Sequence, residues 1–223
     1  MHSQMTARNS QVHVAATVAR PQATGETIEL MGAVMPFARN AEIYGENEPA
    51  EYLYKVVSGA VRTYRVLNDG RRQIGAFYLP GDVFGIEVSD IHTFSAESIV
   101  DSKVMLIKRT SLASLSSRSA DVARQLWTMA ATELQRTQDH TMLLIKTAQE
   151  RVAGFLLEMA KRAPRANAVE LPMSRQDIAD YLGLTIETVS RTLTQLENSA
   201  AIEVPTSRRI VLRNQAALSR LNG

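Results

Sequence analysis

The stretch "MSRQDIADYLGLTIETVSRTLTQLE", from Met173 to Glu197, decides the fold. Ser174 is a favourable N-cap residue and predicts the start of a short helix. Gly183 permits the positive φ of a tight corner, and Thr185 caps a second helix directly after it. A helix, a glycine turn and a second helix form a helix-turn-helix unit, in which the N-terminal part of the second helix enters the DNA major groove.

The apolar residues of the two predicted helices recur at helical spacing and so define one inner face. The inner positions are Ile178, Tyr181, Leu182, Val189, Leu193 and Leu196, with Leu184 filling the corner. Asp177 falls in the first turn of the first helix, where a negative charge is favourable. The outer face of the second helix then carries Ile186, Glu187, Ser190 and Arg191.

These four outward residues have the chemistry of base recognition. Arg191 can donate a forked pair of hydrogen bonds to guanine O6 and N7, and Glu187 can accept from cytosine N4. Ser190 can reach a base edge, and Ile186 can pack on a thymine methyl group. The alternative is an ordinary surface ion pair, because Glu187 and Arg191 are four residues apart and share a face.

A second basic element follows the helices. The segment "AAIEVPTSRRIVLRN" reads as two strands joined by the polar tip Thr206-Ser207-Arg208-Arg209, which is typical of a wing beside a helix-turn-helix. The net charge of the whole chain is only +2, so any affinity for nucleic acid depends on a local patch. The residues predicted to contact the DNA backbone are Ser174, Arg175, Thr185, Thr188, Arg208 and Arg209.

The N-terminal half has a different period. Residues 1–25 are polar and weakly periodic and predict a flexible arm, and residues 26–37 read as a short helix. Short β-branched and aromatic runs then continue to about Arg109, separated by turn residues such as Asp69-Gly70 and Pro80-Gly81-Asp82. This spacing predicts an antiparallel sandwich or barrel. Asp69-Gly70 predicts a hairpin with a type I′ turn.

From Arg109 to Arg162 the sequence is helical. One set of positions alternates spacings of four and three, which is the heptad pattern of two long helices packed side by side. The set comprises Ala123, Trp127, Ala130, Leu134, Thr137, Thr141 and Leu144, and we call it the α-helical seam. It predicts a dimer interface, with a helix lying against its own domain as the alternative. The next helix buries Val152, Phe155, Leu156 and Met159.

Composition narrows the class of protein. The chain has no cysteine, which excludes disulfides, thiolate zinc sites and cysteine-bound iron–sulfur clusters. Its four histidines are scattered, so no metal site is predicted, and we expect His92 to be a surface loop residue. A cupin-type enzyme, the main enzymatic alternative, needs a histidine cluster that the strands lack. There is neither an apolar run long enough to span a membrane nor a secretory signal, and we expect a cytoplasmic location.

The segment "SRQDIADYLGLTIETVSR" closely resembles the DNA-binding signature of the CRP/FNR family of bacterial transcription regulators, in its FNR/FixK branch, with Glu187, Ser190 and Arg191 as the E-x-x-S-R residues. The resemblance implies an α+β protein with a β-roll sensor-like domain (26–117), a dimerisation helix (118–146) and a winged helix-turn-helix domain (147–223). It implies a homodimer that reads a palindrome close to TTGAT-N4-ATCAA and recruits RNA polymerase, mainly as an activator. The expected targets are low-oxygen respiratory or nitrogen-fixation genes.

Departures from the family pattern concern the sensor domain. Members that bind cyclic nucleotides have adjacent Gly-Glu residues and an arginine for the phosphate. This chain has Gly85-Ile86-Glu87 instead, and Phe94 stands where the arginine belongs. Because a buried phosphate needs such a bidentate partner, we do not expect cyclic AMP as the ligand. No cofactor is expected. The β domain is then either purely structural or gated by another small effector, and both alternatives stay open.

The position of Ser174 also invites a redox interpretation. A cysteine there would lie beside Arg175 and a helix N-terminus, both of which lower a thiol pKa. The resemblance to FixK-type regulators, some of which are oxidation-sensitive near their DNA-binding helices, makes Ser174 a candidate redox-control position in an insensitive form. The alternative is a plain N-cap.

Overall fold

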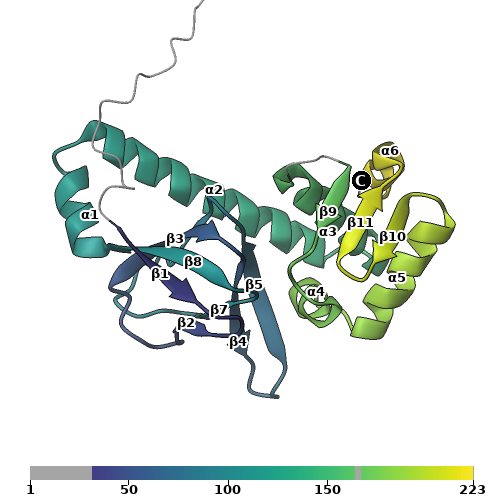
Figure 1. The fold of residues 1–223 in the computed structure, drawn as a ribbon, viewed down its shortest axis with the longest axis horizontal. Helices are drawn as coiled ribbons and strands as arrows, with labels where there is room; N and C mark the ends of the chain where they lie inside the picture. Colours follow the sequence, from purple (N-terminus) through teal and green to yellow (C-terminus); the bar gives the residue numbers. More distant parts are fainter. Residues whose placement is uncertain (1–31, 164–166, 223) are drawn as a thin grey trace, which may run out of the picture.

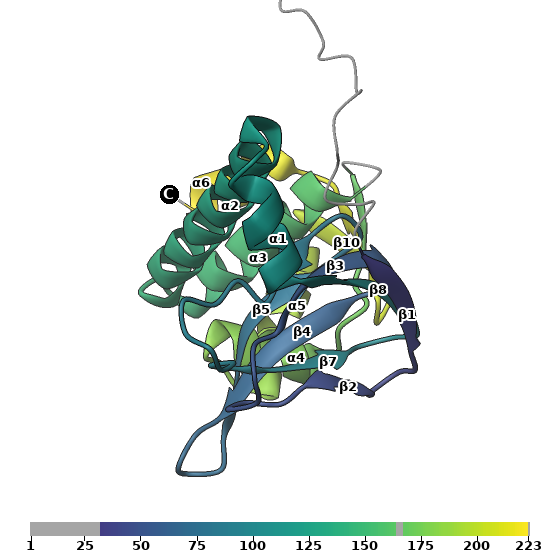
Figure 2. The ribbon, with the colours of Figure 1, turned by 90° about the vertical axis from the view of Figure 1, so that its left-hand side faces the viewer.

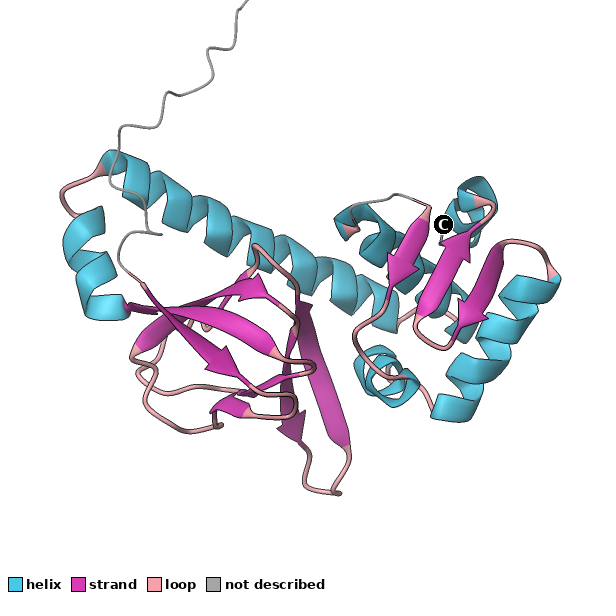
Figure 3. Cartoon of the chain, in the orientation of Figure 1, coloured by secondary structure: helices cyan, strands magenta, loops and turns pink. Residues whose placement is uncertain are grey.

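The computed structural model describes residues 32–163 and 167–222, and over these the chain has three parts (Figure 1). A domain of β strands comes first, a long helix runs from it across the molecule, and a domain of helices with a small sheet follows (Figure 3). The predicted α+β class and the order of its parts are confirmed. The predicted N-terminal arm lies outside the described residues.

Two antiparallel sheets enclose the core of the first domain. One has the order β1-β8-β3-β6, with strands Ala33–Phe37, Ser102–Lys108, Tyr52–Ser58 and Val83–Phe84. The other has the order β2-β7-β4-β5, with strands Glu42–Tyr44, Ser95–Ser98, Val61–Val66 and Arg72–Tyr78. Both sheets contribute to one buried cluster, which comprises Tyr44, Tyr54, Val56, Val61, Tyr78, Phe84, Ala96 and Val104.

The helix predicted over residues 26–37 is wrong where the structure describes it. Residues 33–37 form β1, which pairs antiparallel with Ser102 to Leu106 of β8. Pro36 has no N–H to donate, but β1 is the edge strand of its sheet, where a proline is tolerated. Pairing with a strand distant in sequence therefore overrides the local pattern.

The hairpin predicted at Asp69-Gly70 is confirmed, but its turn type is not I′. The Gly70 N–H donates to the Leu67 carbonyl at 2.9 Å, which closes a turn whose central residues have no positive φ. Gly70 follows with φ of 83°. This is the type I turn followed by a left-handed residue, the usual form of a slightly longer hairpin loop. The β4–β5 hairpin projects from the body of the domain (Figures 1 and 2).

Three helices occupy the region predicted to be helical. They are α1 (Arg109–Ser116), α2 (Ala120–Leu144) and α3 (Ala148–Arg162). Thr147 starts α3 with a capping box that includes Glu150. Figure 2 shows α1 and α2 on one side of the β sheets. The predicted inner residues of α3 are confirmed, because Val152, Phe155, Leu156 and Met159 are at most 3% exposed.

The C-terminal domain contains the predicted helix-turn-helix and wing. The helices are α4 (Arg175–Leu182) and α5 (Ile186–Asn198), and the wing strands are β10 (Ile202–Thr206) and β11 (Arg209–Leu212). A third strand, β9 (Ala168–Glu170), pairs with β11. The short helix α6 (Gln215–Asn222) was not predicted; Asn214 caps it through the Ala217 N–H, and its Leu218 is fully buried.

His92 is not a surface residue. Its ring is completely buried and stacks on Tyr44 with 3.6 Å between ring centroids. Within residues 32–163 and 167–222, neither ring nitrogen has a hydrogen-bond partner, although Nδ1 lies 3.5 Å from a Glu87 carboxylate oxygen. Burial lowers the pKa of His92, against the opposing effect of Glu87. The sequence did not predict this burial, because the stacking partner, Tyr44, lies on the distant strand β2.

Replacing His92 with phenylalanine should make the free energy of unfolding less dependent on pH. Because the folded pKa is lowered, the neutral ring supports stability above the ordinary pKa of about 6.5, and that support is lost as the pH falls through the folded value. Urea unfolding, followed by circular dichroism at about pH 7.5 and about pH 5.5, measures the loss of stability on acidification. We expect a smaller loss in His92→Phe, and an equal or larger loss would contradict the assignment.

Candidate nucleic-acid interface

Hydrogen bonds at the helix starts shape the helix-turn-helix. The Ser174 hydroxyl accepts from the Asp177 N–H at 3.1 Å, and one Asp177 carboxylate oxygen accepts from the Ser174 N–H at 2.9 Å. Gly183 ends α4 in the left-handed conformation with φ of 62°. Arg151 of α3 donates to the Leu182 carbonyl at 2.8 Å and so holds the corner against the rest of the domain. The predicted inner residues of α4 and α5 are all buried.

The predicted base-reading residues lie together on the first two turns of α5. Ile186, Glu187 and Arg191 are exposed, and Ser190 is half-buried between them. The ion pairs between described residues do not include one between Glu187 and Arg191. Hydrogen bonds from its own backbone N–H and from Thr185, with the charge of Arg191, lower the pKa of Glu187. Both side chains are exposed, and the absence of an ion pair between them does not favour the surface ion-pair alternative. The base-reading role of these residues stays a prediction.

Arg175 lies behind this surface. Its Nη1 donates to the Ser190 hydroxyl at 3.3 Å, which connects the first turn of α4 to the outer face of α5. Its Nε is buried and has no partner in the described part of the chain. The contact keeps an arginine beside the predicted base-reading residues, and its contact with the DNA backbone stays a prediction.

The other predicted backbone contacts sit at the helix starts and the wing. Thr185 accepts from the Thr188 N–H at 3.2 Å, and the two hydroxyls are 3.0 Å apart. Arg208 is exposed at the wing tip and donates to the Pro172 carbonyl, while Arg209 lies 3.5 Å from Glu170. The Ser174 hydroxyl is engaged in its cap, so the plain-cap interpretation is supported by geometry. The redox interpretation of Ser174 stays a prediction.

The α-helical seam faces away from its own domain for most of its length. Trp127 is 75% and Leu134 is 60% exposed, and Ala123, Thr137 and Thr141 are exposed as well. Ala130 and Leu144 are half-buried. Two further exposed apolar residues near the end of α2, Met142 and Ile145, were not predicted. The alternative that this face packs on its own domain does not fit these exposures.

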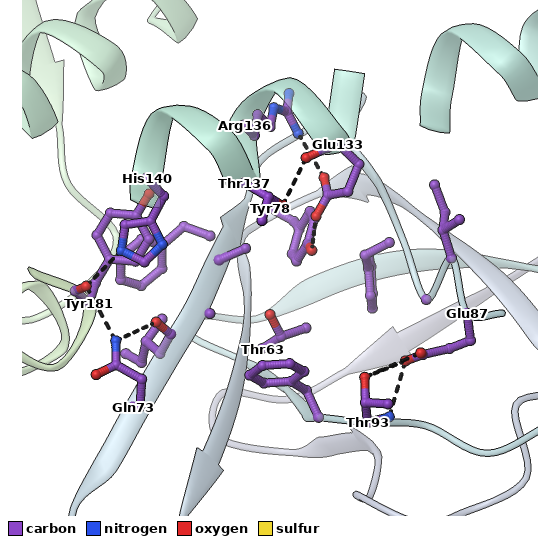
Figure 4. Close-up of a pocket in the computed structure, with 18 of the residues that line it drawn as sticks. Thr63, Gln73, Tyr78, Glu87, Thr93, Glu133, Arg136, Thr137, His140 and Tyr181 are labelled. Atoms are coloured by element: carbon purple, nitrogen blue, oxygen red, sulfur yellow. Dashed lines mark hydrogen bonds and ion pairs between the residues drawn. The ribbon is translucent and has the colours of Figure 1, made fainter. Parts of the chain in front are cut away.

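A cavity of about 440 Å³ lies between the β domain and α2 (Figure 4). Its lining is largely aromatic and carries both acidic and basic side chains. Tyr78 donates to Glu133 at 2.6 Å, and Glu87 accepts from the Thr93 N–H at 3.2 Å. The ring of Phe94 lies against Gly75, where even a methyl group would come within 3.1 Å of it.

The charges in this cavity do not suit a cyclic phosphate. The two guanidinium groups in its lining belong to Arg136 and Arg162, and both pair with Asp82. Glu87 instead presents a carboxylate that accepts from the N–H and the hydroxyl of Thr93, the residue before Phe94. The exclusion of cyclic AMP thus stays a prediction with a structural reason. Among the described residues, no group of three or more His, Cys, Asp or Glu side chains could hold a metal ion.

Two family profiles match the chain. Residues 34–119 match the cyclic nucleotide-binding domain, and residues 150–221 match the Crp-like helix-turn-helix domain. A nitrogen fixation regulation protein FixK from Azorhizobium caulinodans is 49% identical over 92% of this chain and 84% of its own length. The chain belongs to the CRP/FNR family, in its FixK-like branch.

Further relatives agree with this assignment. The fumarate and nitrate reduction regulatory protein of Escherichia coli K12 is 31% identical to this CRP/FNR-family chain, over 84% of the chain and 78% of the relative. The solved structure of FixK2 from Bradyrhizobium japonicum is similar with a TM-score of 0.82 and 53% identity. It covers 86% of this chain and 98% of the FixK2 chain.

Membership of the family makes the chain a DNA-binding transcription regulator rather than an enzyme. The exposed face of α5 and the wing accordingly belong to its DNA-binding domain. The described helices include none that is both long enough and apolar enough to cross a membrane.

Proposed function

We propose that this chain is a homodimeric regulator that reads a palindrome close to TTGAT-N4-ATCAA and recruits RNA polymerase. One observation carries the proposal: Glu187, Ser190 and Arg191 lie side by side on the exposed start of α5, directly after the glycine corner. The start of the second helix is the part that enters the major groove. In the half-site, Arg191 pairs with guanine and Glu187 with the opposite cytosine.

The exposure of the α-helical seam supports the proposed homodimer. A palindrome presents two identical half-sites, and each chain has one recognition helix, so two chains related by a two-fold axis read both. The exposed apolar residues of α2, above all Trp127 and Leu134, supply a surface that needs a partner. Small and polar seam residues such as Ala130 and Thr137 permit close approach of the two helices.

The named relatives support the biological role. Proteins called nitrogen fixation regulation protein FixK in Azorhizobium caulinodans and Rhizobium meliloti are 49% and 39% identical to the chain. We therefore propose control of nitrogen-fixation or low-oxygen respiratory genes, mainly as an activator, in the cytoplasm where the DNA lies.

Titration of a fluorescent duplex with the full chain tests this function. The duplex carries the complete palindrome, and two controls carry one half-site or a scrambled sequence. We expect the palindrome to bind roughly a thousandfold or more tightly than the scrambled duplex, the usual lower range for specific recognition. The half-site should lie in between. Equal affinity for the three duplexes would refute sequence-specific reading.

An effector-gated regulator is the second candidate, and the cavity of about 440 Å³ favours it. Its aromatic lining, whose two arginines already pair with Asp82, would select a small molecule other than a cyclic nucleotide. The two candidates differ in the same titration. A purely structural β domain allows purified chain to bind the palindrome at full affinity, whereas a gated protein binds weakly until the effector is added.

A further inference from the structure

Charged residues join the β domain to the first helix of the helix-turn-helix. Arg62 on β4 donates to Asp177 at 3.0 Å, and Arg72 on β5 donates to the same Asp177 oxygen at 2.6 Å. Arg72 also donates to Asp180 at 2.8 Å. We call Arg62, Arg72, Asp177 and Asp180 the interdomain ion network. Its members are far apart in sequence and lie in separate domains.

Burial makes this network more than a surface contact. The side chains of Arg62 and Asp177 are 9% and 5% exposed. Arg62 also pairs with Glu97 of β7 at 2.9 Å, which fixes the guanidinium within the β sheet. Ion pairs in such sites are screened little by salt, and loss of one partner leaves a buried charge unpaired.

Asp177 divides its two oxygens between the two domains. Oδ2 accepts from the Ser174 N–H and hydroxyl and so builds the cap of α4. Oδ1 accepts from both arginines of the β domain. Burial raises the pKa of Asp177, but the Ser174 hydrogen bonds and the two arginine charges outweigh it, and the net pKa is lowered. The carboxylate therefore stays charged at neutral pH.

The opposite end of α4 is held as well. The Tyr181 carbonyl lies 2.8 Å from His140 Nε2 on α2 and accepts from Gln73 Nε2 on β5 at 3.4 Å (Figure 4). The ring of His140 stacks on Tyr181 with 3.9 Å between centroids. Strand β5 and helix α2 thus contact both ends of α4 between them.

A second set of ion pairs joins the β domain to helices α2 and α3. Asp82, in the Pro80-Gly81-Asp82 turn, pairs with Arg136 of α2 at 2.5 Å and with Arg162 of α3. Arg162 also donates to the Phe77 carbonyl at 3.0 Å. Asp82 therefore joins the β domain to both α2 and α3.

We propose that Arg62 and Arg72 are positioning residues for DNA reading, which set the orientation of the helix-turn-helix by holding α4 through Asp177 and Asp180. The inference rests on the proposed DNA-reading function. The orientation reaches α5 because the two helices share a buried core that includes Ile178, Leu182, Val189 and Leu193. The network is built from side chains of the chain itself, so it holds the two domains together without an effector.

Recognition helices that are held in one orientation lose less entropy when they enter the grooves of one duplex. If the helix-turn-helix domain is not held by the β domain, it must be ordered when it binds DNA, and the entropy lost in that ordering weakens the binding. Arg62 is a suitable test residue, because it is only 8% exposed and cannot itself contact DNA. Its effect on DNA affinity would then pass through the position of the domain.

The test replaces both arginines in the full chain, Arg62→Met with Arg72→Met. The matched control is Arg65→Met on the same strand, whose ion pair with Glu46 stays within the β domain. Because the chain has no cysteine, exposed Lys103 and Gln195 can be changed to cysteine and spin-labelled without background. An excess of unlabelled chain ensures that most dimers contain at most one labelled chain. The measured distance is then the one between β8 and α5 within a single chain.

We expect a narrow distance distribution in the parent and in Arg65→Met, and a broad one in the double variant. Affinity for the palindrome should fall roughly 5- to 150-fold in the double variant only, the usual range of coupling between sites. A narrow distribution together with unchanged affinity in the double variant would overturn the proposal. If the parent itself fails to bind the palindrome, the proposed function is wrong. The distance distribution between β8 and α5 still shows whether the two arginines hold the helix-turn-helix domain in place.

A second variant covers the case in which loss of the buried Arg62 unfolds the β domain. Arg72→Met with Asp180→Asn removes the more exposed half of the network at constant net charge and keeps the Arg62–Glu97 pair. It should broaden the distance distribution and lower the affinity for the palindrome, each by less than the first double variant does. A folded second variant that equals the parent in both measurements contradicts the proposal.

Discussion

Leu134→Glu is expected to convert the protein to monomers and to abolish its preference for a palindrome over a half-site. Leu134 is 60% exposed in the single chain and lies in the middle of the α-helical seam. In a parallel helix pair, equivalent seam positions meet, so two glutamates would face each other. Burying a leucine stabilises by about 1.5–3 kcal/mol, and a desolvated, unpaired charge costs several kcal/mol more.

Sedimentation velocity measures the assembly directly, and the single tryptophan gives a second readout. Trp127 is on the same seam and 75% exposed in one chain, so its emission should shift to longer wavelength when the dimer separates. Gln135→Glu is the matched control, because it adds the same charge one residue along, off the seam. A dimer that survives Leu134→Glu would show that the seam is misplaced, and the dimer should persist in Gln135→Glu.

Arg191→Ala should weaken binding to the palindrome by about 1–3 kcal/mol per half-site and flatten the preference for guanine. The guanidinium is exposed at the second turn of α5, where its fork can reach O6 and N7. Glu187→Ala should instead relax the choice of the cytosine on the opposite strand, with a smaller loss of total affinity. Competition with duplexes substituted at single positions measures both effects.

Arg208→Ala separates base reading from backbone contact. Arg208 is exposed at the wing tip, so its loss should weaken binding to every sequence alike and reduce the salt slope by about 1 per half-site. Base preference should not change. If Arg191→Ala behaves in the same way as Arg208→Ala, then Arg191 contacts phosphate rather than guanine.

The helix-turn-helix was predictable because its determinants are local. Ser174, Gly183 and Thr185 mark its boundaries, and the apolar spacing separates its inner from its outer face. The exposure of the seam followed for the same reason, since heptad spacing on one long helix needs no knowledge of other elements. These features depend on residues within a few turns of each other.

Features that depend on distant partners were not predictable. β1 is a strand because β8 pairs with it, and His92 is buried because Tyr44 stacks on it. The role of Asp177 was only half visible. Its cap of α4 is local, whereas its pairing with Arg62 joins residues 115 positions apart. A sequence pattern does not predict an ion pair of this kind, because in the sequence each partner has the features of an ordinary surface charge.

Selection of binding sites by the unmodified chain, from a pool of randomised duplexes, tests the central claim most directly. The account predicts enrichment of a two-fold symmetric site whose half-sites resemble TTGAT, with the guanine and its paired cytosine fixed in each half. Enrichment of an asymmetric site, or of symmetric sites without that G·C pair, would contradict the proposed reading of DNA by Glu187, Ser190 and Arg191.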